Sequence, residues 1–204
     1  MSGIIGGAGS KSGVIGQTET TGFGDLLWEI SKTSNYNPIE ITQSTHSDLF
    51  TKKYNTYLLI ANGLRYSTGS ASLNMKWEYN GSWKDDYYGY HIRDVQVGTS
   101  AFETTTYSYQ ASSIPLSVDS HRSAGYVNDE LRMWINRPWE LNRQAVNWTM
   151  QYVKGGSGNT RWADGVGLQD ASSYPITGFQ FNANFSSGYW SVFGINSSFH
   201  DTMN

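Results

Sequence analysis

The 204-residue chain carries 14 basic and 17 acidic side chains, a net charge of -3, and no cysteine. Because Lys and Arg are scattered without runs of like charge, we expect neither nucleic acid nor an anionic membrane as a partner. The lack of cysteine excludes disulfides, thiolate metal sites and a cysteine nucleophile. No apolar stretch approaches the ~20 residues that span a bilayer, so membrane insertion is not expected.

The first sixteen residues, MSGIIGGAGSKSGVIG, are rich in glycine and contain one lysine, which are the ingredients of a phosphate-binding loop. A P-loop needs the order G-x-x-x-x-G-K-[ST], and only Lys11-Ser12 fits its end, since Ser10 stands where the second glycine belongs. The dinucleotide pattern G-x-G-x-x-G starting at Gly7 also fails, because its last position is Ser12. The sequence therefore argues against phosphate binding.

Two interpretations of residues 1–21 stay open. Glycine favours an unstructured tail, because it loses the most entropy on ordering. Two apolar pairs that stand ten residues apart, each flanked by glycine, instead suit an extended arm that presses small side chains into grooves on another protein. A lysine between the pairs would meet an acidic or carbonyl-rich groove. The contact residues expected for such an anchoring arm are Ile4, Ile5, Lys11, Val14 and Ile15.

Beyond about residue 21 the glycine-rich segment gives way to patterned apolar residues, and we place the single domain boundary there. The apolar patch from Phe23 to Ile30 fits either a helical turn or a first strand. The polar stretch from Ser31 to Asn37, ahead of Pro38, predicts a turn or loop. No segment after residue 31 shows the helical period of 3.6.

Alternating apolar and polar residues predict strands with one buried face. The segment LNMKWEY at 73–79 alternates in this way and ends at Asn80-Gly81, a hairpin-type turn. The segments NWTMQYV at 147–153 and FQFNANF at 179–185 alternate similarly. Further strands are expected in YLLIANG from residue 57, YYGYHIRDVQVG from 87, TTYSYQ from 105, LRMWIN from 131 and YWSVFGI from 189.

About nine strands separated by Gly, Asn, Asp and Ser turns predict an all-β fold. We expect an antiparallel, jelly-roll-like β-sandwich over residues 22–204, preceded by the extended arm of residues 1–21.

The titratable residues show no arrangement typical of catalysis. The four histidines stand apart, without the spacing of a zinc or triad motif, so packed or surface histidines are the simpler interpretation. Asp129-Glu130 cannot act as an acid/base dyad on a strand, because neighbours point to opposite faces. Asp164-Gly165 is expected to form a turn at the end of a strand. We therefore expect a non-enzymatic protein with no catalytic residue, no metal and no cofactor.

The segment NGSWKDDYYGY at 80–90 gathers aromatic rings with charged residues between them. Such a loop can stack rings on the apolar face of a sugar while carboxylates take its hydroxyls. The simpler interpretation, which we favour, is a hairpin whose rings cover a core edge or a subunit contact. The residues expected at this glycan or subunit contact are Trp83, Asp85, Asp86, Tyr87, Tyr88 and Tyr90.

Three segments of the chain each resemble part of a known family of proteins: the opening GIIGGAGSKSGVIG, the middle YLLIANGLRYSTGSASLNMKWEYNGSW from Tyr57, and the closing ITGFQFNANFSSGYWSVFGI from Ile176. They resemble, in that order, the leader, the middle and the last hairpin of β-rich structural proteins of tailed bacteriophages, especially marine ones. The middle turn departs from that pattern, because it reads Asn80-Gly81-Ser82 where Gly-Gly is usual.

This resemblance covers about half of the chain and implies a non-enzymatic virion protein, assembled in the cytoplasm of a bacterial host. It implies a tail fibre or receptor-binding appendage, held to capsid or tail and adaptor proteins by its arm and often a homotrimer. A capsid decoration or cement protein is the alternative within this class. A host-surface glycan is the ligand expected of the receptor-binding appendage, whereas a decoration protein would bury the same rings between subunits. A free-standing carbohydrate-binding module is the alternative outside this class.

Overall fold

The computed structural model describes residues 24–34, 36–67, 72–97, 103–121, 129–141, 144–169 and 174–196. These residues form two antiparallel sheets and contain no helix, which confirms the expected all-β class. With no helix, the described residues also contain none that could cross a membrane. The arm residues and the boundary at residue 21 lie outside the described part of the chain.

The larger sheet has eight strands in the order β1-β13-β3-β9-β10-β11-β6-β7. In that order the strands are β1 (Asp25–Lys32), β13 (Phe185–Ile195), β3 (Thr56–Tyr66), β9 (Asp129–Asn136), β10 (Gln144–Val153), β11 (Thr160–Gln169), β6 (Tyr88–Gln96) and β7 (Glu103–Ala111).

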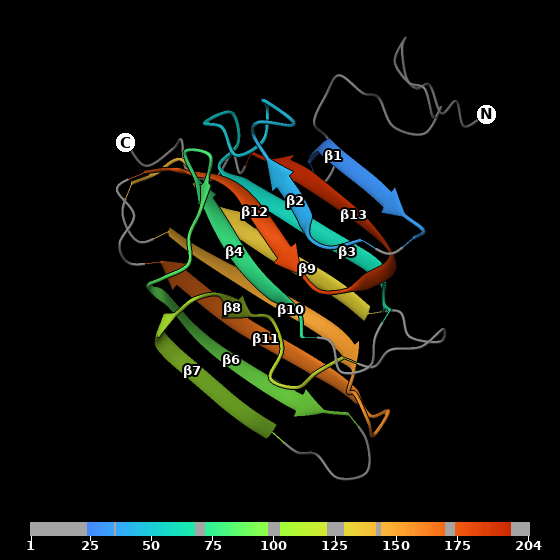
Figure 1. The fold of residues 1–204 in the computed structure, drawn as a ribbon. Helices are drawn as coiled ribbons and strands as arrows, with labels where there is room; N and C mark the ends of the chain where they lie inside the picture. Colours follow the sequence, from blue (N-terminus) through green and yellow to red (C-terminus); the bar gives the residue numbers. More distant parts are fainter. Residues whose placement is uncertain are drawn as a thin grey trace, which may run out of the picture.

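The smaller sheet has the order β2-β12-β4-β5, and a short strand, β8, pairs with β4 beside this path. Its strands are β2 (Ile39–Thr42), β12 (Ile176–Asn182), β4 (Asn74–Tyr79), β5 (Ser82–Trp83) and β8 (Ile114–Pro115). Figure 1 shows β2, β12 and β4 lying over one face of the larger sheet.

Aromatic rings from both sheets fill the space between them. Phe181 on β12 meets Trp190 on β13 with ring centroids 4.9 Å apart. Phe50, in the turns after β2, contacts Phe179 of the smaller sheet at 5.1 Å and Tyr57 of the larger sheet at 5.3 Å. Each ring removes a large apolar area from water, so these contacts hold the two sheets together.

The alternating segments at 73–79 and 147–153 form strands as predicted, in β4 and β10. In β4, Met75 and Trp77 are fully buried, and Asn80 and Gly81 follow with φ of 49° and 78°, as a tight hairpin turn requires. The apolar patch that fitted either a helical turn or a strand is the strand β1.

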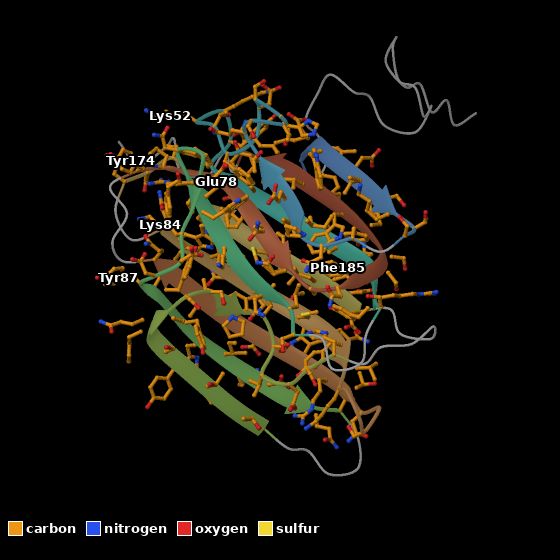
Figure 2. All side chains as sticks on the ribbon, viewed as in Figure 1. Lys52, Glu78, Lys84, Tyr87, Tyr174 and Phe185 are labelled. Atoms are coloured by element: carbon orange, nitrogen blue, oxygen red, sulfur yellow. The ribbon has the colours of Figure 1, made fainter. Side chains whose placement is uncertain are left out.

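The segment FQFNANF is divided, because β12 ends at Asn182 and β13 begins at Phe185. Phe185, labelled in Figure 2, is fully buried at this turn.

The prediction of a turn at Asp164-Gly165 is wrong, because both residues lie inside β11. Gly165 pairs with Trp148 of β10, and a Cβ at Gly165 would lie 2.3 Å from the Trp148 ring. The indole Nε1–H of Trp148 donates to the carbonyl of Leu116 at 3.0 Å. The glycine is therefore needed for packing: it leaves room for a tryptophan lying across the strand.

The larger sheet extends beyond the smaller one at β6 and β7. In Figure 1, β7 forms the margin of the molecule, away from β2, β12 and β4. None of its nine side chains is buried, whereas every second side chain of β10 is buried along the whole strand. On β7, Ala111 is the hydrophobic residue that packs against the core, and the other face of the larger sheet points away from it.

Burial raises the pKa of Tyr66, Tyr88 and Tyr152 above the ordinary tyrosine value of 10.0. In the unfolded chain these phenols ionise near that ordinary value. Their contribution to stability is therefore complete below pH 10 and is lost as the pH rises above it.

We predict that the free energy of unfolding, measured by urea titration, falls as the pH rises above 10, and that it falls less in the variant Tyr66→Phe. The exposed-ring control Tyr109→Phe should retain the full fall, and an equal fall in all three proteins would contradict the prediction.

Candidate functional site

One face of the larger sheet carries the side chains that point away from the core. Because neighbours on a strand alternate, the residues beside buried Met133, Trp148 and Ile92 lie on this opposite face. We call it the open face. Figure 1 views the molecule from the side of the smaller sheet, so the open face is turned away from the viewer.

Residues on the open face form transverse rows, with one residue from each of five neighbouring strands. The first row is Trp134, Asn147, Val166, His91 and Tyr107. The second is Arg132, Thr149, Asp164, Arg93 and Thr105, and the third is Glu130, Gln151, Trp162, Val95 and Glu103. With about 4.8 Å between strands, each row covers roughly 19 Å.

Three hollows follow these rows. The largest, of about 530 Å³, lies between β7, β6 and β11 and includes Tyr107, Tyr109 and Leu168. The second, of about 340 Å³, includes Asn147 and Asp164 and shares His91 and Val166 with the first. The third, of about 160 Å³, is lined by Glu130, Arg132, Thr149, Gln151 and Trp162. The hollows therefore follow one another across the sheet.

Exposed aromatic rings line two of the three hollows, Tyr107 and Tyr109 on β7 at the largest and Trp162 on β11 at the third. Tyr107 is 66% exposed, Tyr109 80% and Trp162 43%, although large rings are usually buried. Tyr107 and Tyr109 meet edge to face with centroids 6.0 Å apart. Exposed rings flanked by hydrogen-bonding groups are typical of ligand sites, where the ring supplies apolar contact and the polar groups set orientation.

Polar side chains share the open face with these rings. The Arg93 guanidinium and the Asp164 carboxylate contact each other at 3.1 Å from adjacent strands, which fixes both side chains. Arginine has five N–H donors and a carboxylate about four acceptor sites, so both keep capacity for a ligand. Across the rows, the carboxylates of Glu103, Glu130 and Asp164 face two guanidinium groups, and the charges nearly cancel.

The residues expected from the loop at 80–90 do not form one surface. Tyr88 is fully buried, and its hydroxyl accepts from the amide of Trp77 at 2.7 Å. Tyr90 packs against the core, while Trp83 is half-buried in β5. Asp85 and Asp86 are exposed, and Asp85 pairs with Lys76.

Tyr87, immediately before β6, is exposed at the margin of the molecule, as Figure 2 shows. Of the six residues, only Tyr90 lines a hollow of the open face, namely the largest.

Asp129 and Glu130 lie on opposite faces of β9, as predicted. Glu130 is exposed on the open face, and Asp129 is fully buried. Asp129 contacts the Nδ1 atom of His121 at 2.7 Å, and the Nε2 atom of His121 contacts the Ser117 hydroxyl at 2.8 Å. The structure thus brings together a serine, a histidine and an aspartate that sequence spacing did not single out.

Hydrogen bonding in this trio opposes nucleophilic catalysis. The Ser117 hydroxyl donates its one hydrogen to the carbonyl of Asp119 at 2.9 Å, so in the 2.8 Å contact with His121 it accepts a hydrogen bond from Nε2–H. A histidine that activates serine needs Nε2 unprotonated. The ring of His121 packs against Tyr66 and Tyr152, with ring centroids 4.9 and 4.5 Å away. None of the three hollows reaches it. The trio is a buried structural link.

Charged groups continue this link between strands. Asp94 on β6 accepts from the Tyr152 hydroxyl and from the amide of Val118 at 3.2 Å. Arg161 on β11 contacts Asp119 at 2.9 Å and Asp94 at 3.5 Å. The segment 116–121, which lies outside the strands, is thereby tied to β6, β10 and β11, the middle three of the five strands whose rows form the open face.

Burial raises the pKa of Asp129, and the hydrogen bond from His121 partly opposes this shift. Within the described residues, no group of three or more His, Cys, Asp and Glu side chains could hold a metal ion.

Comparison with protein-family models, with curated proteins and with solved structures found no match to this chain. The geometry of the open face therefore carries the functional argument.

We predict that Ser117 does not react with an organophosphonate probe for activated serines, because its hydroxyl is committed to the Asp119 carbonyl. Intact-protein mass spectrometry after incubation should show no adduct, with an active serine hydrolase as the positive control. An adduct that maps to Ser117 would contradict the structural interpretation of the trio.

Proposed function

We propose that this protein is a non-enzymatic carbohydrate-binding β-sandwich whose ligand lies along the rows of the open face. The observation that carries the proposal is the set of three hollows on neighbouring strands of the open face, lined by the exposed rings of Trp162 and Tyr107 and by polar side chains. A sugar ring has apolar C–H faces that match aromatic rings and hydroxyls that match amides, carboxylates and guanidinium groups. The site thus offers both kinds of contact that a sugar needs.

The charge balance favours a neutral glycan. Three carboxylates face two guanidinium groups over the three rows, so a polyanionic ligand would meet no excess of positive charge. The length of a row, roughly 19 Å at ordinary strand spacing, suits an oligosaccharide of several units. The proposed ligand class is therefore a neutral oligosaccharide that runs across the strands.

For the biological setting, we propose a virion appendage of the tail-fibre or receptor-binding type, in which the open face meets a host-surface glycan. The resemblance of the opening, middle and closing segments to phage structural proteins supports this setting. Jelly-roll connectivity of the two sheets and an extended anchoring arm at residues 1–21 belong to the same proposal. The exposed rings of the open face favour a receptor-binding appendage over a capsid decoration protein, which would bury such rings between subunits.

Glycan binding is tested first by screening the full chain on an array of neutral and acidic glycans, followed by calorimetric titration of the best neutral oligosaccharide. We expect Trp162→Ala and Asn147→Ala each to weaken binding roughly tenfold, which corresponds to about 1.4 kcal/mol. Leu26→Ala is the matched control, since Leu26 is half exposed on β1 and lies outside the rows. Exclusive binding of acidic glycans, or equal binding by all variants, would count against the proposal.

The virion setting is tested separately by deleting residues 2–16. The shortened protein should keep its β-rich circular dichroism spectrum and its glycan binding but should no longer join phage particles during assembly. Incorporation of the shortened protein at the normal level would show that these residues do not anchor it.

A further inference from the structure

The strand β7 is an edge of the larger sheet that the described part of the chain leaves unpaired. Its partner on one side is β6, and no described strand lies on its other side. An edge strand presents a row of backbone N–H and C=O groups that can pair with another chain.

Other sheet edges in the described residues are protected. At the opposite end of the larger sheet, β1 carries Asp25, Glu29 and Lys32 and has an irregular register at Leu26 and Trp28. In the smaller sheet, the edge strand β2 has four residues, and β5 and β8 have two each. Charge, irregularity and shortness are the usual devices that prevent edge pairing.

β7 is less protected than these edges, since its nine residues carry one charge and its register is irregular only near its end. Its sequence, ETTTYSYQA, contains no lysine, arginine or proline, and Glu103 at its start is its single charged residue. Three consecutive threonines favour extended backbone. The register with β6 is regular from Glu103 to Ser108, and an irregularity follows before Ala111. The exposed rings of Tyr107 and Tyr109 stand on this same strand.

We propose that β7 pairs antiparallel with β7 of a second copy of this chain, about a two-fold axis at Thr106. In this register Thr105 lies opposite Tyr107 of the second copy on the open face, and the pair occurs twice by symmetry. On the other face, Thr106 meets its own counterpart and Thr104 meets Ser108. Aromatic with β-branched pairs, and Thr with Thr or Ser, are favourable cross-strand neighbours.

Self-complementarity identifies the second copy as the occupant. The only charged side chain of the strand, Glu103, lies at its end, so the two-fold pair keeps the two carboxylates far apart instead of opposite each other. An axis perpendicular to the sheet also leaves both open faces on the same side. Two copies could then engage one glycan-bearing surface, which increases avidity without new contacts.

The pairing is tested by sedimentation of the full chain over a range of concentrations. The expected species is a dimer, and Thr106→Lys and Thr106→Glu, which place like charges opposite each other, should each weaken dimerisation roughly tenfold or more. An equimolar mixture of the two variants should dimerise again, because opposite charges then meet. Ser31→Lys on β1 is the control and should leave the dimer intact.

Crosslinking gives a second readout that does not depend on a charge in the strand. The chain has no cysteine, so Thr106→Cys introduces a single thiol that should form a disulfide between two copies on mild oxidation, whereas Ser31→Cys should not. A wild-type chain that stays monomeric, a three-fold assembly, or dimers that persist in both charged variants would overturn the proposal.

Discussion

Eight strands face five across the core, and the aromatic contacts between them cover only part of the larger sheet. A sheet gains stability by burying one face against another layer, and here that face is the one that holds Trp148, Trp190 and Tyr57. The other face and the β7 margin have no partner layer in the described residues. The proposals for a ligand and for a second copy depend on these two features, because the uncovered outer face leaves a surface for the ligand and the unequal width of the sheets leaves a free edge at β7.

The segment 116–121 closes the core where the smaller sheet ends. It is held by charged groups, Arg161 with Asp94 and Asp119, and by the contacts of His121 with Ser117 and Asp129. Desolvation of such groups costs much of what their attraction gains, so their main effect is to specify one arrangement of neighbouring strands. They fix β6, β10 and β11 relative to one another, and these strands carry Arg93, Asn147 and Asp164 on the opposite face. A buried polar network thus positions an exposed site.

Much of the fold was predictable from alternation, since β4, β10 and the hairpin turn at Asn80-Gly81 need only a period of two and a favoured turn. The strand β11 was not, because its glycines at 165 and 167 look like a turn until Trp148 and Ile114 are seen to occupy the space beside them. That error hid the place of Trp162 and Asp164 in the candidate site.

The cluster of rings at 83–90 was a misleading guide for the opposite reason. Three of its four aromatic residues, Trp83, Tyr88 and Tyr90, are buried or half-buried, because β5 and β6 place them at or near the core. The exposed rings that line the hollows are separated in sequence and meet only through strand register. The same holds for Ser117, His121 and Asp129, whose chemistry becomes visible only when β9 is placed beside the 116–121 segment.

Binding of a neutral oligosaccharide across the open face can be followed at the indole N–H groups of the eight tryptophans by two-dimensional ¹H–¹⁵N NMR spectra. On titration with the oligosaccharide selected by the array, the indole signals of Trp162 and Trp134 should shift in a saturable manner. The signals of buried Trp77 and Trp190 should stay unchanged. Saturable binding that leaves Trp162 and Trp134 unshifted would place the ligand elsewhere and contradict binding across the open face.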